Sequence, residues 1–290
     1  MSTAVATEPH RHATPLREQK LGFGHLLRGE WIKFWSVRST TWTLSIFLIA
    51  TVGLVVLISL AFVNVPSPEE GGPPEGTAGN PLDPLSIAVT LAQLAVAVLG
   101  ALTITSEYST GMIRSSLTAV PKRLPMLWSK AIVLVVSVFA VAVVAVALAM
   151  TLQWVFFDSQ GFSVDATDPE IIRPLLGTAV YLATIALFSY SLGALMRHSA
   201  AALATVLGVL LVAPILFSAI PWKPLQQAFP FLPGVAGQQF TQTTEQLEAA
   251  AASSGPDVVD LTAWAGYGVL IAWIVLILGV AAVLLKRRDA

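Results

Sequence analysis

Few side chains in this 290-residue chain have the types and spacing that chemistry requires. There is no cysteine, no His-Glu-x-x-His zinc motif and no Gly-x-Ser-x-Gly nucleophile turn, which disfavours thiolate, zinc and serine-hydrolase chemistry. Gly-Lys-Ser/Thr is also absent, so the chain cannot supply a Walker A loop for ATP. The four histidines, His10, His12, His25 and His198, lie outside the centres of the apolar stretches. These observations argue against an enzyme, and no cofactor or metal is expected.

The remaining polar and aromatic residues form two candidate functional segments. In the first, residues 22–38, apolar residues recur at helical spacing with charged residues opposite them. We expect a helix in the plane of the lipid headgroups, where Trp can satisfy both its apolar ring and its N–H. The candidate residues are Glu30, Trp31, Lys33, Phe34 and Trp35. An unpaired Glu30 carboxylate would be costly near the apolar face, so Lys33 on the same helix is its expected partner.

The second candidate segment, residues 107–130, reads EYSTGMIRSSLTAVPKRLPMLWSK. A short helix is expected from about residue 109 to residue 120, capped by Ser109 or Thr110 and ended by Pro121. One face of this helix would be apolar, formed by Ile113, Leu117 and Val120. That face needs a partner, either the cytoplasmic helix ends of the same chain or a separate subunit. We favour the separate subunit.

Six apolar stretches must position these two segments, and each has about the ~20 residues that a membrane-spanning helix needs. They are residues 41–63, 85–106, 131–157, 175–196, 200–220 and 263–285. Because 55% of the residues are hydrophobic and the mean hydropathy is +0.75, most of the chain is expected to contact membrane lipids. We predict an all-α, polytopic integral membrane protein. It has a disordered tail at residues 1–21 and one six-span domain at residues 22–290.

Charged residues alternate between the two sides of the predicted membrane. The N-terminal segment, the second and fourth connections and the C-terminal tail are basic, whereas the other three connections are acidic. By the positive-inside rule, both termini are cytoplasmic, and we expect a multi-pass protein of the cell (plasma or inner) membrane. The net charge of -1 conceals these two opposed surfaces and does not support a nucleic-acid partner.

The centres of the six stretches contain no Asp, Glu, Lys, Arg or His, although ion-coupled carriers usually need such groups near the midplane. Gln93 and Gln153 are the conspicuous polar residues there, and each is expected to hydrogen-bond to another helix. Pro214 should kink the fifth span. Residues 221–240 are too rich in Pro and Gly to cross the membrane and too aromatic for a wet loop, so a re-entrant or interface-lying segment is expected.

Two segments of the chain resemble the permease subunits of ABC type-2 exporters. GEWIKFWSVRSTTW at residues 29–42 looks like the N-terminal signature of that family, and residues 107–130 are similar to its segment after span two. The positions that fit the family's loose pattern are Glu107, Tyr108, Gly111, Ile113, Arg114, Leu117, Pro121, Arg123 and Lys130. Met112 departs from the Thr often seen there. The six-span topology extends the resemblance over most of the chain.

The resemblance implies two permease chains, identical or similar, that form a pathway above a dimer of cytoplasmic ATPase subunits. ATP would be bound by those subunits. It also implies an amphipathic helix at residues 23–38 and a coupling helix at about residues 109–120. The residues implied to act in coupling are Glu107, Tyr108, Gly111, Ile113, Arg114, Leu117 and Arg123. Two other classes stay open: an ion-coupled secondary carrier, and a membrane assembly or anchoring protein that transports nothing.

Overall fold

The computed structural model describes residues 22–63, 82–111, 123–158, 169–253 and 258–287, and within these ranges every regular element is a helix. Six helical segments are long and apolar enough to cross a membrane. They are α2 (Arg38–Val63), α3 (Asp83–Ser109), α5 (Arg123–Asp158), α6 (Pro169–Met196), the fifth span at Ser199–Ala219 and α12 (Ala263–Arg287). The prediction of an all-helical chain with six spanning-length segments is confirmed, and these segments indicate a multi-pass membrane protein.

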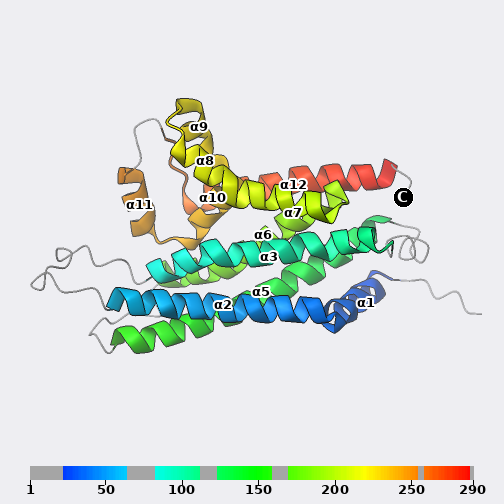
Figure 1. The fold of residues 1–290 in the computed structure, drawn as a ribbon, viewed down its shortest axis with the longest axis horizontal. Coiled ribbons are helices and arrows are strands. Elements are labelled where there is room, and N and C mark those ends of the chain that lie inside the picture. The colour runs from blue at the N-terminus through cyan, green and yellow to red at the C-terminus, as the bar shows by residue number, and fades with distance from the viewer. Residues whose placement is uncertain (1–21, 64–81, 112–122, 159–168, 254–257, 288–290) are drawn as a thin grey trace, which may run out of the picture.

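The six long segments lie side by side in an elongated bundle (Figure 1). α6 is central to this bundle, because it packs against α3, α5 and α12. α2 packs against α3 and α5. The short helix α1 (Phe23–Ser36) lies at the end of the bundle where α2 begins, which we call the α1 end. α11 (Thr244–Ser253) lies at the opposite end.

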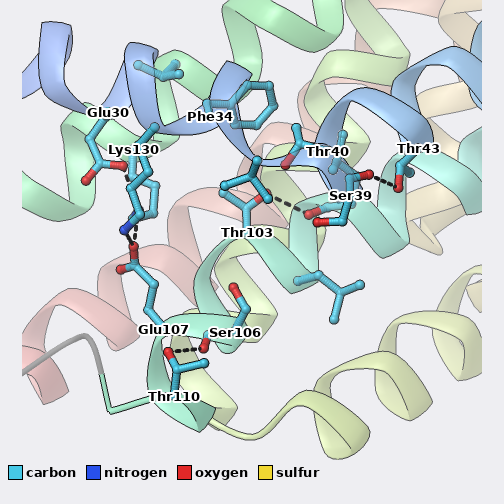
Figure 2. A pocket seen from close by; sticks show the side chains of 15 residues that line it. Glu30, Phe34, Ser39, Thr40, Thr43, Thr103, Ser106, Glu107, Thr110 and Lys130 are labelled. Carbon is cyan, nitrogen blue, oxygen red and sulfur yellow. Dashed lines mark hydrogen bonds and ion pairs between the residues drawn. The ribbon is translucent and has the colours of Figure 1, made fainter.

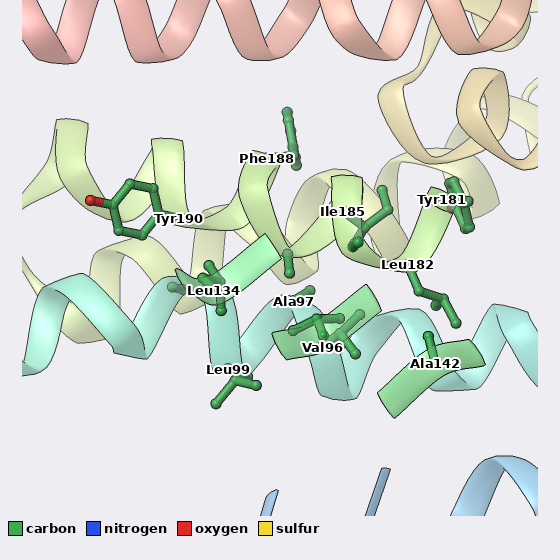
Figure 3. Packing of buried hydrophobic residues seen from close by; sticks show 14 of the residues in the cluster. Val96, Ala97, Leu99, Leu134, Ala142, Tyr181, Leu182, Ile185, Phe188 and Tyr190 are labelled. Atoms are coloured by element: carbon green, nitrogen blue, oxygen red, sulfur yellow. The ribbon is translucent and has the colours of Figure 1, made fainter. Parts of the chain in front are cut away.

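α3 and α6 approach each other closely because a glycine of each helix faces the backbone of the other. A Cβ atom added at Gly100 of α3 would lie 2.2 Å from the carbonyl oxygen of Ala186 in α6. One added at Gly193 of α6 would lie 2.9 Å from the carbonyl oxygen of Ala101 in α3. Small residues permit such approach between membrane helices. Apolar side chains of α3, α5 and α6 fill the surrounding layer (Figure 3).

α5 begins earlier than the sequence predicts. It runs from Arg123 to Asp158, whereas the predicted span starts at residue 131. At 1.5 Å per residue its 36 residues extend about 54 Å, well beyond a hydrocarbon core of ~30 Å. The assignment of Lys130 to a connecting loop is therefore wrong, because the first turns of α5 continue past the apolar stretch.

The fifth span is irregular next to its proline. It consists of α7 (Ser199–Leu207), the π-helical turn η2 (Gly208–Val212) and α8 (Ala213–Ala219), with Pro214 in the first turn of α8. Proline has no N–H to donate, so the α-helical hydrogen-bond ladder is interrupted there. The N–H of Ala213 instead reaches back five residues to the carbonyl of Gly208. The irregularity expected at Pro214 thus takes the form of a π turn directly before it.

Residues 221–241 form a series of short helices in place of a spanning helix. These are α9 (Lys223–Ala228), η3 (Phe229–Phe231), α10 (Pro233–Gln238) and η4 (Gln239–Thr241). α10 and η4 pack against α6 and α12. A Cβ at Gly266 of α12 would lie 2.3 Å from the carbonyl oxygen of Ala236, so α10 lies directly on the α12 backbone. The protein therefore covers α10 and η4, as Pro- and Gly-rich backbone requires at membrane depth, whereas α9 is largely exposed.

Tyr181 of α6 ties this segment to the bundle. Its fully buried hydroxyl donates to Oε1 of Gln93 in α3 and to the carbonyl oxygen of Gly234 in α10. The hydrogen bond confirms the prediction that Gln93 bonds across to another helix. Gln153 is buried in α5. A single buried hydroxyl thus holds α3, α6 and α10 together.

Replacing Tyr181 with phenylalanine is expected to destabilise the protein by about 1–3 kcal/mol, because two buried acceptors lose their donor. The thermal midpoint of the purified chain in detergent measures this loss. Tyr267→Phe is the matched control. The Tyr267 hydroxyl pairs with that of Thr184, which also bonds to the carbonyl of Val180 and keeps that partner. Equal midpoints for the two variants would contradict the proposed tie.

α11 is fixed at its N-terminus to two of the spans. The Gln246 N–H donates to Oγ1 of Thr243 and Gln246 Oε1 accepts from the Thr243 N–H, which together form a capping box. Gln246 also donates to Oδ1 of Asp83 at the start of α3, and the Thr244 hydroxyl donates to Oε2 of Glu170 at the start of α6. These bonds brace the ends of α3 and α6 opposite the α1 end.

Candidate functional site

Four charged side chains from three helices form a continuous ion-pair network at the α1 end (Figure 2). Lys130 of α5 lies 2.7 Å from Oε2 of Glu30 in α1 and 2.8 Å from Oε1 of Glu107 in α3. Lys33 of α1 also pairs with Oε1 of Glu107. The network therefore joins α1 to both α3 and α5.

The centre of this network is buried. The side chains of Glu107 and Lys130 are only 3% and 4% exposed, whereas Lys33 is 31% exposed. Removing such charges from water costs several kcal/mol per ion unless opposite charges compensate for it. Here each central group contacts two groups of opposite sign, and the formal charges of the four side chains sum to zero. Compensation of this kind makes the junction specific, because the loss of either central member leaves one of the outer charges unpaired.

The prediction for Glu30 is correct in the kind of partner and wrong in which residue it is. Glu30 does bind a cation, but the cation is Lys130, one hundred positions along the chain, and not Lys33 on the same helix. Lys33 instead reaches across to Glu107. Spacing along a single helix favoured the local pair, whereas the packing of α1 against α5 brings the more buried Lys130 to Glu30.

The end of α3 lies later than the sequence predicts. Ser109 is the last residue of α3, and its hydroxyl donates to the carbonyl of Ser106 in the same helix. Thr110 likewise donates to the Ser106 carbonyl. The chain turns away at Gly111, whose φ of +70° lies in the left-handed region that favours glycine. The two expected capping residues thus lie at the C-terminal end of α3, and the expected coupling helix lies outside the described residues.

Several predicted coupling residues lie outside the described residues. Ile113, Arg114 and Leu117 belong to residues 112–122, as does most of the expected coupling helix. Arg123 is the first residue of α5. The structure thus brings Glu107, Tyr108 and Gly111 to the α1 end, directly before residues 112–122.

The residues of the first candidate segment occupy one helix with a mostly exposed surface. Phe34 is the buried residue of α1, while Trp31 and Trp35 are 43% and 38% exposed. The two indole rings lie 6.0 Å apart, and Trp35 also contacts Phe34 edge to face. α1 therefore presents its Trp pair outward and its charged pair, Glu30 and Lys33, to α3 and α5.

Tyr108 contacts a third connection at the α1 end. The guanidinium carbon of Arg197 lies 5.7 Å from the centroid of the Tyr108 ring, which is a cation–π distance. Arg197 follows α6 with a φ of 57° and His198 caps α7, so two residues join the helices. The predicted residue Tyr108 thereby links the end of α3 to the turn between α6 and α7.

A cavity of about 350 Å³ lies beside the ion-pair network and is partly open to the outside. The charged residues form one side of it, and hydroxyl-bearing and apolar residues of α2, α3 and α5 form the rest (Figure 2). The hydroxyl-bearing members are Ser39, Thr40, Thr43, Thr103, Ser106 and Thr110. None of the five that belong to α2 and α3 was singled out as a site residue from the sequence. Helical spacing could have identified this face of the cavity, since residues 99, 103, 106 and 110 line up along one side at the C-terminal end of α3.

Within the part of the chain that the structure describes, no group of three or more His, Cys, Asp or Glu side chains could hold a metal ion. No family model matches the chain, and no curated protein matches it. Its function must therefore be argued from its own residues and their arrangement.

Proposed function

We propose that this chain is the transmembrane permease subunit of an ATP-driven exporter of the ABC type-2 kind. Two such chains, identical or similar, form the substrate pathway, and separate ATPase subunits bind and hydrolyse ATP. The observation that carries this proposal is the buried network of Glu30, Lys33, Glu107 and Lys130. It ties α1, α3 and α5 together at the end of α3, which directly precedes residues 112–122.

The distribution of charge supports a cytoplasmic α1 end. Arg28, Arg38 and Arg197 lie there, and so does Lys286 in the last turn of α12. The opposite end carries acidic residues on α3, α6, α11 and the chain before α12: Asp83, Glu170, Glu245, Glu248 and Asp260. Lys/Arg-rich ends face the cytoplasm in most membrane proteins. We therefore place the end of α3, and with it the proposed contact of residues 112–122 with an ATPase, on the cytoplasmic side.

The network supplies a route for force. When ATP binding closes the partner ATPases, they push on residues 112–122. The push reaches the end of α3 through Glu107, and Lys130 and Lys33 pass it to α5 and α1. Buried ion pairs suit this task because they fix one arrangement of the helices and resist slippage. The coupled helices then move as rigid bodies, and the pathway opens to the other side.

Purification of the tagged full-length chain from membranes tests the proposal directly. An ATPase subunit with Walker A, signature and Walker B motifs should copurify, and ATP should drive transport by the reconstituted complex in sealed vesicles. An ion-coupled carrier would instead transport without ATP. An assembly or anchoring protein would transport nothing and would bring no ATPase with it.

Lys33→Gln should lower ATP hydrolysis by the reconstituted complex severalfold without preventing membrane insertion. The change removes the tie between α1 and α3 and leaves the buried pair of Glu107 and Lys130 in place. Arg28→Gln on the same helix is the control, since Arg28 is exposed and loses the same charge. If the two variants hydrolyse ATP at the same rate as the unaltered complex, the network does not couple the ATPase to the spans.

A further inference from the structure

The cavity beside the network contains an unused acceptor. Glu107 accepts hydrogen bonds from Lys33 and Lys130 through Oε1, but its Oε2 atom is buried and has no hydrogen-bond partner. Glu107 lines the cavity, and its side chain is only 3% exposed. A buried carboxylate oxygen without a donor is costly. Oε2 itself has almost no accessible surface, so a donor within the cavity removes that cost once the Glu107 carboxylate rotates toward it.

The hydroxyl groups along the cavity also offer acceptors. Thr43 donates its proton to the carbonyl of Ser39, Thr103 to that of Leu99 and Thr110 to that of Ser106. Each of these protons is used within its own helix, so what each oxygen can offer a ligand is a lone pair. A complementary ligand must therefore bring several donors.

The charge of the site selects a neutral ligand. The four side chains of the network already balance, and an added ammonium or carboxylate would leave one uncompensated charge among half-buried groups. Hydroxyl groups suit the site better, because they donate to Oε2 of Glu107 and to the threonine oxygens and accept from the half-exposed Lys33. The other walls are apolar and include Phe34, Leu102 and Val133, which fit a hydrocarbon portion.

We propose that this cavity binds the uncharged, hydroxyl-rich headgroup of an amphiphile, a sugar or glycerol polyol carried on an apolar chain. A volume of about 350 Å³ is within the range of small-molecule sites. The headgroup lies against Glu107, Thr43 and Thr103, and the apolar chain follows the surface toward Leu102. This inference goes beyond the proposed transport role, and it holds whether or not an ATPase partner exists.

Equilibrium binding of radiolabelled octyl glucoside to the full-length chain in phosphatidylcholine nanodiscs tests it, with empty nanodiscs as the blank. We expect saturable binding. Octyl glucoside with every sugar hydroxyl methylated should fail to compete, because it keeps the shape and loses the donors. Competition by the methylated compound, tighter binding of octylamine than of octyl glucoside, or the absence of saturable binding would each overturn the proposal.

A pair of double variants locates the binding. Thr43→Val with Thr103→Val removes two cavity oxygens and should weaken binding by about tenfold or more. Thr51→Val with Thr105→Val is the matched control: one threonine from α2 and one from α3, each bonded to its own helix, neither on the cavity. The control should bind as the unaltered chain does. Equal binding by the two double variants would overturn the assignment to this cavity.

A competition experiment tells whether the natural ligand is a membrane lipid or a soluble molecule. Glucosyl diacylglycerol placed in the nanodisc should displace octyl glucoside if the site takes a membrane glycolipid. Retention of octyl glucoside in its presence would indicate a soluble glycoside that enters from outside the bilayer. Both results support the same headgroup chemistry, and they differ only in where the ligand comes from.

Discussion

Replacing Lys130 with methionine is expected to destabilise the protein by about 3–5 kcal/mol, the largest effect of any single charge removal in the chain. Methionine preserves most of the volume of the lysine stem, so the loss is mainly electrostatic. Without the ammonium, Glu30 loses the cation with which it pairs, and the buried Glu107 retains only the half-exposed Lys33. The thermal midpoint and the yield of monodisperse protein after extraction measure the change.

Two further variants separate this cause from a general loss of positive charge. Lys286→Met removes an exposed lysine from the last turn of α12 and should stay within about 0.5 kcal/mol of the unaltered chain. Glu107→Gln added to Lys130→Met should recover part of the stability, because it removes the carboxylate that has lost its main partner. If Lys130→Met and Lys286→Met proved equally stable, the network would not be a stabilising feature.

Gly100→Ala should destabilise the protein by about 1–3 kcal/mol or more, because the new methyl group meets backbone and not a side chain that can move. Its Cβ would lie 2.2 Å from the carbonyl oxygen of Ala186, and relief requires α3 and α6 to separate. Thermal unfolding in detergent is again the measurement.

The same substitution at an open position should have the opposite sign. Gly53 of α2 and Gly279 of α12 have no atom within 4 Å of an added Cβ. Alanine is about 0.5–1 kcal/mol better than glycine within a helix, so each of these variants should be slightly more stable than the unaltered chain. A destabilised Gly53→Ala chain beside an unaffected Gly100→Ala chain would show that α3 and α6 do not meet as described.

The long helices could be predicted from the sequence because their signal is local. A run of about 20 apolar residues needs no knowledge of its neighbours to be identified as a spanning segment. The extension of α5 to Arg123 could not be seen in the same way, since Lys130 reads as the polar end of a loop. Its burial depends on Glu30 and Glu107, which are distant in sequence.

The candidate site was predicted in parts and not as a whole. Helical spacing and charge selected Glu30 and Lys33, the family resemblance of residues 107–130 selected Glu107, and the cost of an unpaired Glu30 carboxylate correctly predicted a cation as its partner. Which lysine meets which carboxylate depends on the packing of α1 against α5, and one sequence carries no such pairing information. The cavity hydroxyls were missed for a related reason: Thr and Ser are common in spans, where they bond to their own helix.

The interlocked glycines of α3 and α6 limit how the bundle can work. The contact of Gly100 with Ala186 and the contact of Gly193 with Ala101 lie about two turns apart along α6 and side by side on α3. Neither α3 nor α6 can rotate or slide against the other while both backbone contacts are kept. Any rearrangement of the spans must therefore move α3 and α6 together as one unit, and the fifth span, the least buried of the six, is the one most free to move against them.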